Sequence, residues 1–368
     1  MADLHIVCET TVEESFRVQQ VRGLFDLSAE KTARVDIHAQ APPLDEPWQI
    51  GLIVGPSGSG KSTVARQLFG DALFQCAAWP ADRAVVDGFG EALSMREICA
   101  ALTAVGFSSP PAWLRPYRVL SNGERFRCDL ARALVSGGEL LAFDEFTSVV
   151  DRTVAKIGGM AVAKAVRGGR TAVKKFVAIS CHYDISEWLC PDWIVDMATG
   201  RLARGRLCRP AMGLRIHSCG REVWGMFARH HYLSGHLPAG PCFLSTVQLP
   251  DQPPCPCGFA AIAPVLGHVG YWRISRIVVL PDYQGAGVGG VLRDAVAVQA
   301  MRRPGCRRLS IVTSHPGMVA GLKRSPDWVC TDVSNGSRRP GLLRGNRVKT
   351  STGRMVCSFV WRPKNGGE

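Results

Sequence analysis

The sequence lacks long apolar runs, paired-cysteine motifs and, toward its end, acidic residues. No stretch of its 368 residues approaches the ~18 consecutive apolar residues that a membrane span needs, so no membrane-embedded role is expected. The first residues, MADLHIVCETTVEES, do not have the basic-then-apolar order of a secretory signal. The fourteen cysteines include no CxxC pair, so we expect reduced thiols in the cytoplasm of a bacterial, archaeal or phage-infected cell. Cys255 and Cys257 would need two further ligands to bind zinc, and only Cys208, Cys219 and Cys242 are near in sequence.

Acidic residues are scarce in the second half of the chain. Residues 1–207 contain 23 Lys and Arg against 24 Asp and Glu, a net charge of −1, whereas residues 208–368 contain 21 against 7, a net charge of +14. This imbalance predicts a polyanionic partner, first of all nucleic acid. The alternative is that the positive charge serves the phosphates of coenzyme A and solubility.

The most basic segment, residues 302–364, contains 14 Lys and Arg and only two acids. Its Gly-, Ser- and Asn-rich stretch predicts a basic loop suited to backbone phosphates. Trp328 and Trp361 either stack on bases or belong to the core. The basic residues of the predicted loop are Arg338, Arg339, Arg344, Arg347 and Lys349.

A phosphate-binding loop, GPSGSGKST, occupies residues 55–63 directly after the apolar run Ile50–Val54. An apolar run of this length predicts a buried strand, and residues 62–69 predict a helix whose N-terminus faces the anion. The glycines let backbone N–H groups turn onto phosphate oxygens, Lys61 reaches the terminal phosphates, and Ser62 offers a hydroxyl to Mg²⁺. The predicted ATP-binding residues of the loop are Gly55, Ser57, Gly58, Ser59, Gly60, Lys61, Ser62 and Thr63.

A second apolar run, Leu140–Phe143, ends in two adjacent carboxylates, Asp144 and Glu145. Such carboxylates repel each other unless a cation lies between them. The pattern is typical of a nucleotide site in which Asp144 orders the Mg²⁺ shell and Glu145 polarises the attacking water.

Residues 120–134, LSNGERFRCDLARAL, resemble the signature motif of ABC-type ATPases, with Asn122 in place of one glycine. Ser121 and Gly123 match the signature itself. Asp151 in the SVVD sequence at 148–151 matches the D-loop of that family, and His182, after the expected strand Val177–Ser180, matches its switch histidine. A closing hairpin is expected over residues 193–204.

This resemblance implies that Ser121 and Gly123 of one chain complete the ATP site of a second, so that ATP holds a homodimer together. Only 60 residues separate Lys61 from Ser121, fewer than in transport ATPases. The shortened region is where transporters dock on membrane partners, which argues against transport.

The segment RISRIVVLPDYQGAGVGGVLRDAV, beginning at Arg273, resembles the acetyl-coenzyme A motif of GNAT-type acetyltransferases. Successive N–H groups at the start of a helix cradle a pyrophosphate. In this family the preceding strand splays from its neighbour, and its backbone binds the pantetheine arm. The resemblance therefore implies that Val278, Val279 and Leu280 bind the arm. It implies that the pyrophosphate lies on Gln284, Gly285, Ala286, Gly287, Val288 and Gly289.

The catalytic group of the transfer is harder to place. Many members of this family carry a tyrosine that acts as general acid on the helix after the next strand, yet residues 316–326 contain no tyrosine. Residues 228–240, ARHHYLSGHLPAG, loosely resemble phage Mom-type enzymes that modify DNA bases. Histidine titrates near neutrality and suits general base work, so we name His230, His231 and Tyr232 as candidates. Ser314 and His315 are second in rank.

These patterns predict two modules that meet near residues 204–212, a basic stretch with Gly and Pro. Residues 1–207 are expected to form a P-loop ABC-type ATPase domain with a mixed α/β sheet and a short helical subdomain. Residues 208–368 are expected to form a GNAT-fold α+β domain. The predicted cofactors are ATP, Mg²⁺ and acetyl-CoA or another acyl-CoA.

The predicted function is ATP-driven, acyl-CoA-dependent acyl transfer to a nucleic-acid base, or to an amine installed on one. Unstacking a base before chemistry requires energy, which gives an ATPase a purpose beside a transferase. Two alternatives remain open. One is an ATP-gated acetyltransferase of a protein or small amine, and the other is a non-catalytic nucleic-acid clamp.

Overall fold

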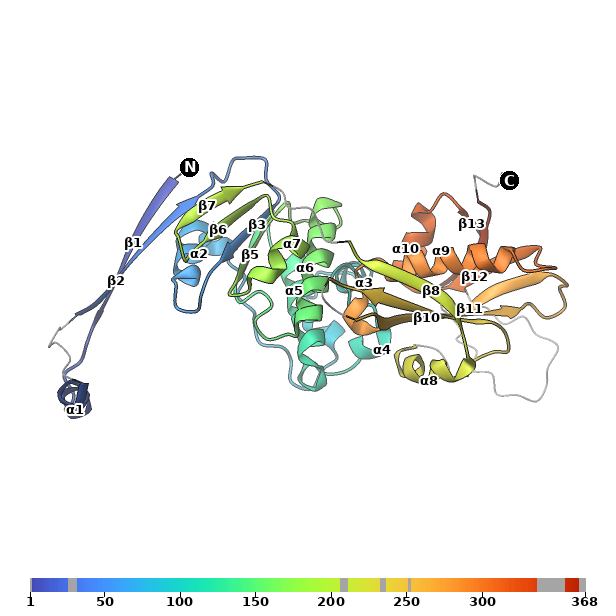
Figure 1. Ribbon diagram of the computed structural model, residues 1–368, viewed down its shortest axis with the longest axis horizontal. Helices are drawn as coiled ribbons and strands as arrows, with labels where there is room; N and C mark the ends of the chain where they lie inside the picture. Colours follow the sequence, from blue (N-terminus) through green and yellow to red (C-terminus); the bar gives the residue numbers. More distant parts are fainter. Residues whose placement is uncertain are drawn as a thin grey trace. The chain divides into compact units, whose positions relative to one another are not determined.

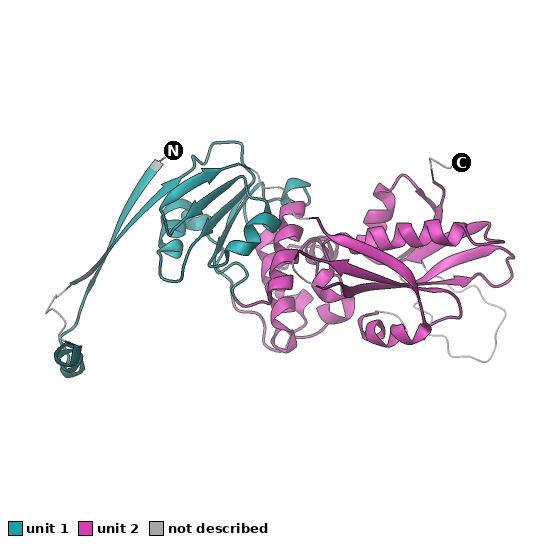
Figure 2. Ribbon diagram, viewed as in Figure 1, with its two compact units in different colours: residues 1–76, 137–148, 166–209 teal, residues 77–136, 149–165, 210–368 magenta. Residues whose placement is uncertain are grey.

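The computed structural model divides the chain into two compact units (Figures 1 and 2). Unit 1 comprises Met1–Cys76, Gly137–Ser148 and Val166–Arg209, and unit 2 comprises Ala77–Ser136, Val149–Ala165 and Pro210–Glu368. The residues that the structure describes are 2–25, 32–205, 211–231, 236–250, 253–335 and 355–363. Residues 206–210 of the predicted module break at 204–212 lie outside them, as do the basic loop from Arg338 to Lys349 and Tyr232.

Unit 1 is built on a five-stranded mixed sheet of strand order β4-β5-β3-β6-β7. The first four of these strands are parallel, and the last is antiparallel to its neighbour. The apolar runs predicted as buried strands are confirmed, since every residue of β3 is buried. The strands are β3 (Ile50–Val54), β4 (Leu140–Phe143), β5 (Lys175–Ser180), β6 (Trp193–Asp196) and β7 (Arg201–Arg204).

Helix α2 (Lys61–Phe69) covers this sheet through Val64, Ala65 and Phe69, which share one core with β3, β5 and β6. The short α7 (Ser186–Leu189) follows β5. An antiparallel hairpin of β1 (Ala2–Thr11) and β2 (Thr32–Ala41), with α1 (Phe16–Phe25) between its strands, was not predicted.

The first part of unit 2 is helical. Its helices are α3 (Met95–Ala104), α4 (Pro110–Trp113), α5 (Asn122–Ser136) and α6 (Arg152–Arg167), the last of which ends in unit 1. Ser94 and Glu97 form a capping box at the start of α3. The stretch from α3 to α5 is the short helical subdomain expected between the phosphate loop and Asp144.

The second part of unit 2 is a seven-stranded sheet of order β13-β14-β12-β11-β10-β9-β8. Helix α9 buries Leu292, Val296 and Ala300 in one core with this sheet. Trp328 and Trp361 lie in the same core, 4% and 8% exposed, so the core interpretation is confirmed for both. The elements are β8 (Gly213–Cys219), α8 (Trp224–Phe227), β9 (Cys242–Gln248), β10 (Cys255–Pro264), β11 (Tyr271–Val279), α9 (Val288–Met301), β12 (Arg308–Thr313), α10 (Pro316–Arg324), β13 (Trp328–Asn335) and β14 (Met355–Trp361). The predicted fold class, a mixed α/β module followed by an α+β module, is confirmed.

Strands β11 and β12 separate along their length, as the acyl-CoA motif predicts. They pair in parallel only from Tyr271↔Arg308 to Ile274↔Ile311. Beyond that point β11 stays with β10 as far as Val279, whereas β12 continues its pairing with β14. One side of the second half of β11 is therefore open toward β12.

Residues 221–230 do not form the single helix that their sequence suggests. The segment is a 3₁₀ turn, the one-turn α8, and a second 3₁₀ turn at Ala228–His230. Only Trp224 and Phe227 are buried there, so the apolar period extends over no more than one turn. Across the described ranges, no helix combines the length and apolar character needed to cross a bilayer.

Candidate functional site

Three predicted ATP-site motifs of unit 1 meet at one edge of its sheet. The phosphate loop follows β3, Asp144 and Glu145 follow β4, and His182 comes two residues after β5. These strands are parallel neighbours in the order β4-β5-β3. Carboxyl ends of parallel strands meet at the same edge, which is where ligands of such sheets bind.

The phosphate loop has the backbone of an anion cradle. Gly58 and Gly60 have φ values of 77° and 84°, in the left-handed region that favours glycine, and α2 begins directly after Gly60. Lys61 folds over the loop, where its Nζ donates to the carbonyls of Gly55 (2.9 Å) and Pro56 (2.7 Å). The Ser59 hydroxyl is buried with no partner among the described residues. An ammonium, an unpaired hydroxyl and a helix N-terminus at one loop fit a nucleotide phosphate.

The carboxylates after β4 lie on a strained turn. Glu145 and Thr147 have φ values of 53° and 70°, an uncommon conformation for residues with a Cβ. Asp144 Oδ1 accepts the Glu145 N–H at 2.8 Å, and the Glu145 carbonyl accepts the Ser148 hydroxyl at 2.7 Å. Such strain gathers at functional sites, where the surrounding structure fixes it.

His182 is half-buried, and its backbone N–H donates to the Ser180 hydroxyl at 3.1 Å. Its Nδ1 lies 3.6 Å from the Cys181 sulfur. A side chain at this strand end is well placed for a contact with a terminal phosphate bound at the same edge.

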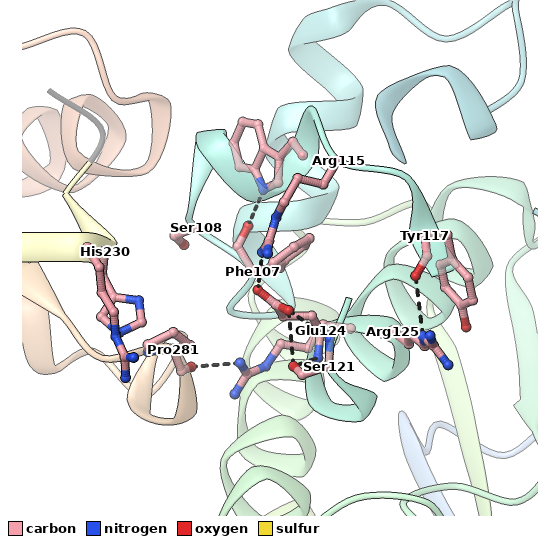
Figure 3. A network of polar contacts seen from close by, with 12 residues as sticks. Phe107, Ser108, Arg115, Tyr117, Ser121, Glu124, Arg125, His230 and Pro281 are labelled. Atoms are coloured by element: carbon pink, nitrogen blue, oxygen red, sulfur yellow. Dashed lines mark hydrogen bonds and ion pairs between the residues drawn. The ribbon is translucent and has the colours of Figure 1, made fainter. Parts of the chain in front are cut away.

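The signature residues lie in unit 2, at the start of α5 (Figure 3). Ser121 and Glu124 form a reciprocal cap: the Ser121 N–H donates to Glu124 Oε2 (2.9 Å), and the Glu124 N–H donates to Ser121 Oγ (3.3 Å). Arg115 holds the same carboxylate at 2.9 Å. A Cβ on Gly123 would lie 3.3 Å from Val154 on α6. The exposed Ser121 hydroxyl is thus fixed where another molecule can reach it.

Asp151, the predicted D-loop residue, caps α6. Its Oδ1 accepts the N–H groups of Thr153 (2.9 Å) and Val154 (3.0 Å). A carboxylate at a helix N-terminus satisfies free amides and favours the helix dipole.

The predicted acyl-CoA loop also has the geometry of an anion site. Gly285 and Gly287 have φ values of 90° and 101°, and Gly287 is the N-cap of α9, with no side chain over the first amides. Ala286 lies between them, and α9 begins with the buried Val288 followed by Gly289. The first N–H groups of a helix have no acceptor within it, so this end can bind a pyrophosphate.

The end of β11 is joined to this loop. The Leu280 N–H donates to the Cys257 carbonyl of β10 (2.9 Å), whereas the Val279 carbonyl accepts from Gln284 Nε2 (2.9 Å). Backbone groups of a strand alternate between its two sides, so the Gln284 amide lies on the open side of β11. Val278 is buried in a core with Trp224 and Phe227.

The candidate bases His230 and His231 follow α8, whose Trp224 and Phe227 pack against Val278. Burial lowers the pKa of His230, and Arg229 lowers it further, donating to His230 Nε2 at 3.1 Å. Burial, with a smaller contribution from Arg276, lowers the pKa of His231 to about 4. Both rings are therefore neutral at pH 7, the form in which an imidazole acts as a base, and in His230 the unprotonated nitrogen is the Nε2 that accepts from Arg229.

The second-rank candidate His315 has a different role. His315 is a structural residue, because its Nδ1 caps α10 by accepting the Met318 N–H (3.3 Å) while its Nε2 lies 3.0 Å from the Ser108 carbonyl. Helix α10 carries no tyrosine. Within the described part of the chain no group of three or more His, Cys, Asp or Glu could hold a metal ion.

Sequence reasoning missed Arg127, which is 1% exposed. A signal was present, because Arg127 shares a helical face with Leu130, Ala131 and Leu134, three, four and seven residues further along α5. An arginine on the apolar face of a helix predicts a buried charge with partners.

Residues 217–320 match the acetyltransferase (GNAT) family. No curated protein sequence matches the chain. A dimeric bacterial ABC transporter cassette, MJ0796, is 16% identical over 48% of this chain and 93% of its own, with a TM-score of 0.34.

Two acetyltransferase structures are also similar. The IAA acetyltransferase from Bacillus cereus is 11% identical over 41% of this chain and 100% of its own (TM-score 0.27). The ribosomal-protein-S18-alanine N-acetyltransferase from Escherichia coli is 16% identical over 42% and 97% (TM-score 0.30). The family match identifies residues 217–320 as a GNAT acetyltransferase domain. The glycine loop and the splayed strand lie within this range.

Proposed function

We propose that this chain is an ATP-hydrolysing acyltransferase that moves an acyl group from acyl-CoA to an amine of a nucleic-acid base, or to an amine on a modified base. The observation that carries the transferase part is the glycine loop at the start of α9, beside the open side of β11, inside the GNAT domain. The ATPase part rests on three motifs at one sheet edge.

In the transfer, the acyl-CoA supplies a thioester carbonyl, which the acceptor amine attacks. Gly285, Gly287 and the first amides of α9 bind the pyrophosphate, and the backbone of β11 up to Leu280 aligns the pantetheine arm. A new C–N bond forms as the C–S bond breaks. His230 or His231, neutral at pH 7, accepts the amine proton, and the departing thiolate takes up a proton. Tyr232 stays a candidate for that second proton transfer.

In the ATPase, Lys61 neutralises the terminal phosphates, while Ser62 and Asp144 hold Mg²⁺. Glu145 polarises the attacking water, and His182 contacts the γ-phosphate. Ser121, Gly123 and Asp151 of a second copy complete each site, so ATP binding forms a homodimer. The exposed cap at Ser121 supports this role.

A basic surface with aromatic residues supports a nucleic-acid acceptor. Arg303 lies over the Trp272 ring (5.6 Å to its centroid), and Arg308 lies over the Tyr271 ring (5.4 Å). Arg302 and Arg307 are exposed beside them, and no acidic residue occurs in the sequence from 295 to 326. Guanidinium groups bind backbone phosphates, and the two rings hold the guanidinium groups of Arg303 and Arg308 in place at this surface.

The test is acetyl transfer from radiolabelled acetyl-CoA by the full chain, with DNA, RNA, a protein extract and small amines as separate acceptors. We expect label in the nucleosides of one nucleic acid. Label in protein or small amines alone would make that acceptor class the correct one. If acetyl-CoA binds but no acceptor is labelled, the non-catalytic clamp is the better interpretation.

A salt series tests the surface itself. Log affinity for nucleic acid should fall linearly with log salt, and each lost phosphate contact should reduce the slope by ~0.7–0.9. Replacing Arg303 and Arg308 with Ala should therefore flatten the slope, whereas Arg96→Ala, an exposed arginine on α3, should leave it unchanged. A slope insensitive to Arg303 and Arg308 would remove this surface from the proposal.

A further inference from the structure

The helix that begins at the signature motif is bonded to the segment before the acyl-CoA loop. Arg127 of α5 donates from one terminal nitrogen to the Pro281 carbonyl (2.7 Å) and from the other to the Asp282 carbonyl (3.3 Å). Figure 3 draws the bond to the Pro281 carbonyl. Arg127 lies six residues after Ser121, about 9 Å along a helix. Pro281 and Asp282 lie two to three residues before Gln284.

Arg127 is a buried charge in a place where an apolar residue would cost less. Desolvation lowers its pKa to about 10, so it stays charged at neutral pH. Burial raises the pKa of the neighbouring Asp282, while Arg127 acts in the opposite direction. Apolar replacement of a buried charge often stabilises a protein, so Arg127 is better explained by the two carbonyls that it positions than by stability.

Ser108, in the helical subdomain, is held by two residues of the GNAT domain. Its N–H donates to Gln284 Oε1 (2.8 Å), and its carbonyl lies 3.0 Å from His315 Nε2. Because His315 Nδ1 accepts the Met318 N–H, Nε2 carries the proton and donates to Ser108. Gln284, the first residue of the acyl-CoA motif, thus spans from Ser108 to the Val279 carbonyl.

Backbone from the two segments meets at glycines. Gly106 has a φ of 83°, and a Cβ there would lie 2.3 Å from the Gln284 carbonyl oxygen. A Cβ on Gly285 would lie 2.9 Å from the Ala161 Cβ and 3.0 Å from the Gly106 Cα. Contacts this short admit only hydrogen, so neither glycine can be replaced without moving the loop.

Helix α6 makes a second connection. It begins at the cap formed by Asp151, the D-loop residue, and carries Ala161 against Gly285. One turn further on, Lys164 Nζ lies 3.2 Å from where a Cβ of Gly287 would be. The Lys164 ammonium group therefore lies next to the loop that is proposed to bind the pyrophosphate.

We propose that the helical subdomain forms one side of the acyl-CoA site, and that ATP-dependent pairing at Ser121 and Asp151 changes acyl-CoA affinity through α5 and α6. Arg127, Ser108 and Gly106 act as positioning residues, and Lys164 is a ligand of the pyrophosphate. This inference rests on the proposed function of both sites.

Coupling of this kind is reciprocal. If bound nucleotide changes the affinity for acyl-CoA by some factor, bound acyl-CoA must change the affinity for nucleotide by the same factor. The factor depends on how differently the two states of the subdomain hold the loop, and factors of ~5–150 are typical. If nucleotide changes acyl-CoA affinity and acyl-CoA changes nucleotide affinity by the same measured factor, the effect is coupling between the two sites and not a loss of active protein caused by one ligand.

The experiment is calorimetric titration of the full chain with acetyl-CoA, without nucleotide and with saturating Mg²⁺ and a non-hydrolysable ATP analogue. We expect the two dissociation constants to differ by ~5-fold or more. The reverse titration, analogue into protein with and without acetyl-CoA, should give the same factor.

Two variants locate the connection. Arg127→Met removes both bonds while keeping an apolar chain, and Gly106→Ala pushes the subdomain off Gln284. Arg127→Met should bind both ligands with a coupling factor near 1. Gly106→Ala should also have a coupling factor near 1, and it should bind acetyl-CoA more weakly because the loop moves. Arg127→Lys, which can hold one carbonyl but not two, should recover part of it. Arg125→Met is the control, because Arg125 of the same helix donates to the Tyr117 carbonyl (3.3 Å) within the subdomain. If Arg127→Met fails to fold, Arg127→Lys gives the answer, because it keeps the buried charge and should still have a smaller coupling factor than the unaltered protein.

The outcomes are distinct. Equal acetyl-CoA affinity with and without nucleotide in the unaltered protein would overturn the coupling while leaving both sites intact. Coupling that persists in Arg127→Met and Gly106→Ala would overturn the assigned route. Absence of acetyl-CoA or nucleotide binding altogether would instead overturn the proposed function.

Discussion

Replacing Lys164 with Met should weaken acyl-CoA binding specifically through the pyrophosphate. The Nζ of Lys164 lies 3.2 Å from the Cβ position of Gly287, at the mouth of the loop that opens α9. Methionine keeps the length and much of the apolar stem of lysine but removes the charge. The substitution therefore tests the ammonium group and not the packing of α6.

The size of the effect follows from the distance and the half-buried setting of Lys164. Two unit charges 4 Å apart attract by ~4 kcal/mol at an effective dielectric constant of 20, which is an upper bound because both lose water on pairing. A hydrogen bond to a charged group contributes ~1.5–3 kcal/mol net. At the lower end of that range, Lys164→Met should raise the dissociation constant of acetyl-CoA by about tenfold.

The assay compares two acyl donors by calorimetry. Acetyl-CoA contains the pyrophosphate, and acetyl-pantetheine does not, so Lys164→Met should weaken only the first. Lys156→Met, two turns earlier on the same helix, is the matched control and should change neither. Equal loss for both donors would mean that Lys164 supports the fold of the loop. No loss for either would refute the placement of the pyrophosphate beside Lys164.

The other predictions concern the ATP site, the acyl-CoA loop and the dependence of stability on pH. Lys61→Ala should abolish ATP turnover, because the phosphates lose their cation. Glu145→Gln should bind ATP, hydrolyse it slowly and sediment as a dimer. If Glu145→Gln sediments as a monomer in the presence of ATP, the composite site is contradicted. Gly287→Glu should prevent acetyl-CoA binding by calorimetry without reducing ATPase activity, whereas Gly287→Ala, with the same backbone strain but no carboxylate, should bind more weakly and not fail altogether. The folded pKa of His231 is about 4 against an ordinary 6.5, so the unfolded chain binds more protons between these values. Stability should therefore fall as the pH decreases from 6.5 to 4, and His231→Gln should flatten the dependence of the melting temperature on pH; equal slopes would show that His231 is not buried in the neutral form.

Much of unit 1 was predictable because its signals are local. Each of β3, β4 and β5 is an apolar run that ends in a chemical motif, and parallel pairing then brings the motifs to one edge. The hairpin of β1 and β2 was not predicted. The period-2 signal of a strand was present, since Val35, Ile37 and Ala39 of β2 alternate with polar residues, but the pairing joins residues as far apart as Ala2 and Ala41, which no local pattern specifies.

In the GNAT domain the sequence located β11, the glycine loop and α9, since strand, turn and helix follow one another within 30 residues. The catalytic candidates were less certain, and the structure separates the first-rank histidines from the second-rank His315. His231 contacts the ring of Trp224, which shares a core with Val278 of β11, while His315 is fixed by two hydrogen bonds in a structural role. A histidine's partners, not its sequence context, decide between these roles.

The sequence by itself therefore determined which segments form the two glycine loops that we propose to bind phosphate, because glycine conformation and helix starts depend on neighbouring residues. Only the tertiary structure decided that the helical subdomain and the acyl-CoA loop are one packed unit. Arg127 and Pro281 are 154 residues apart, and Ser108 and His315 are 207 apart. No local pattern encodes such a contact. It depends on two surfaces that are close-packed and on buried polar groups that each find a partner across them.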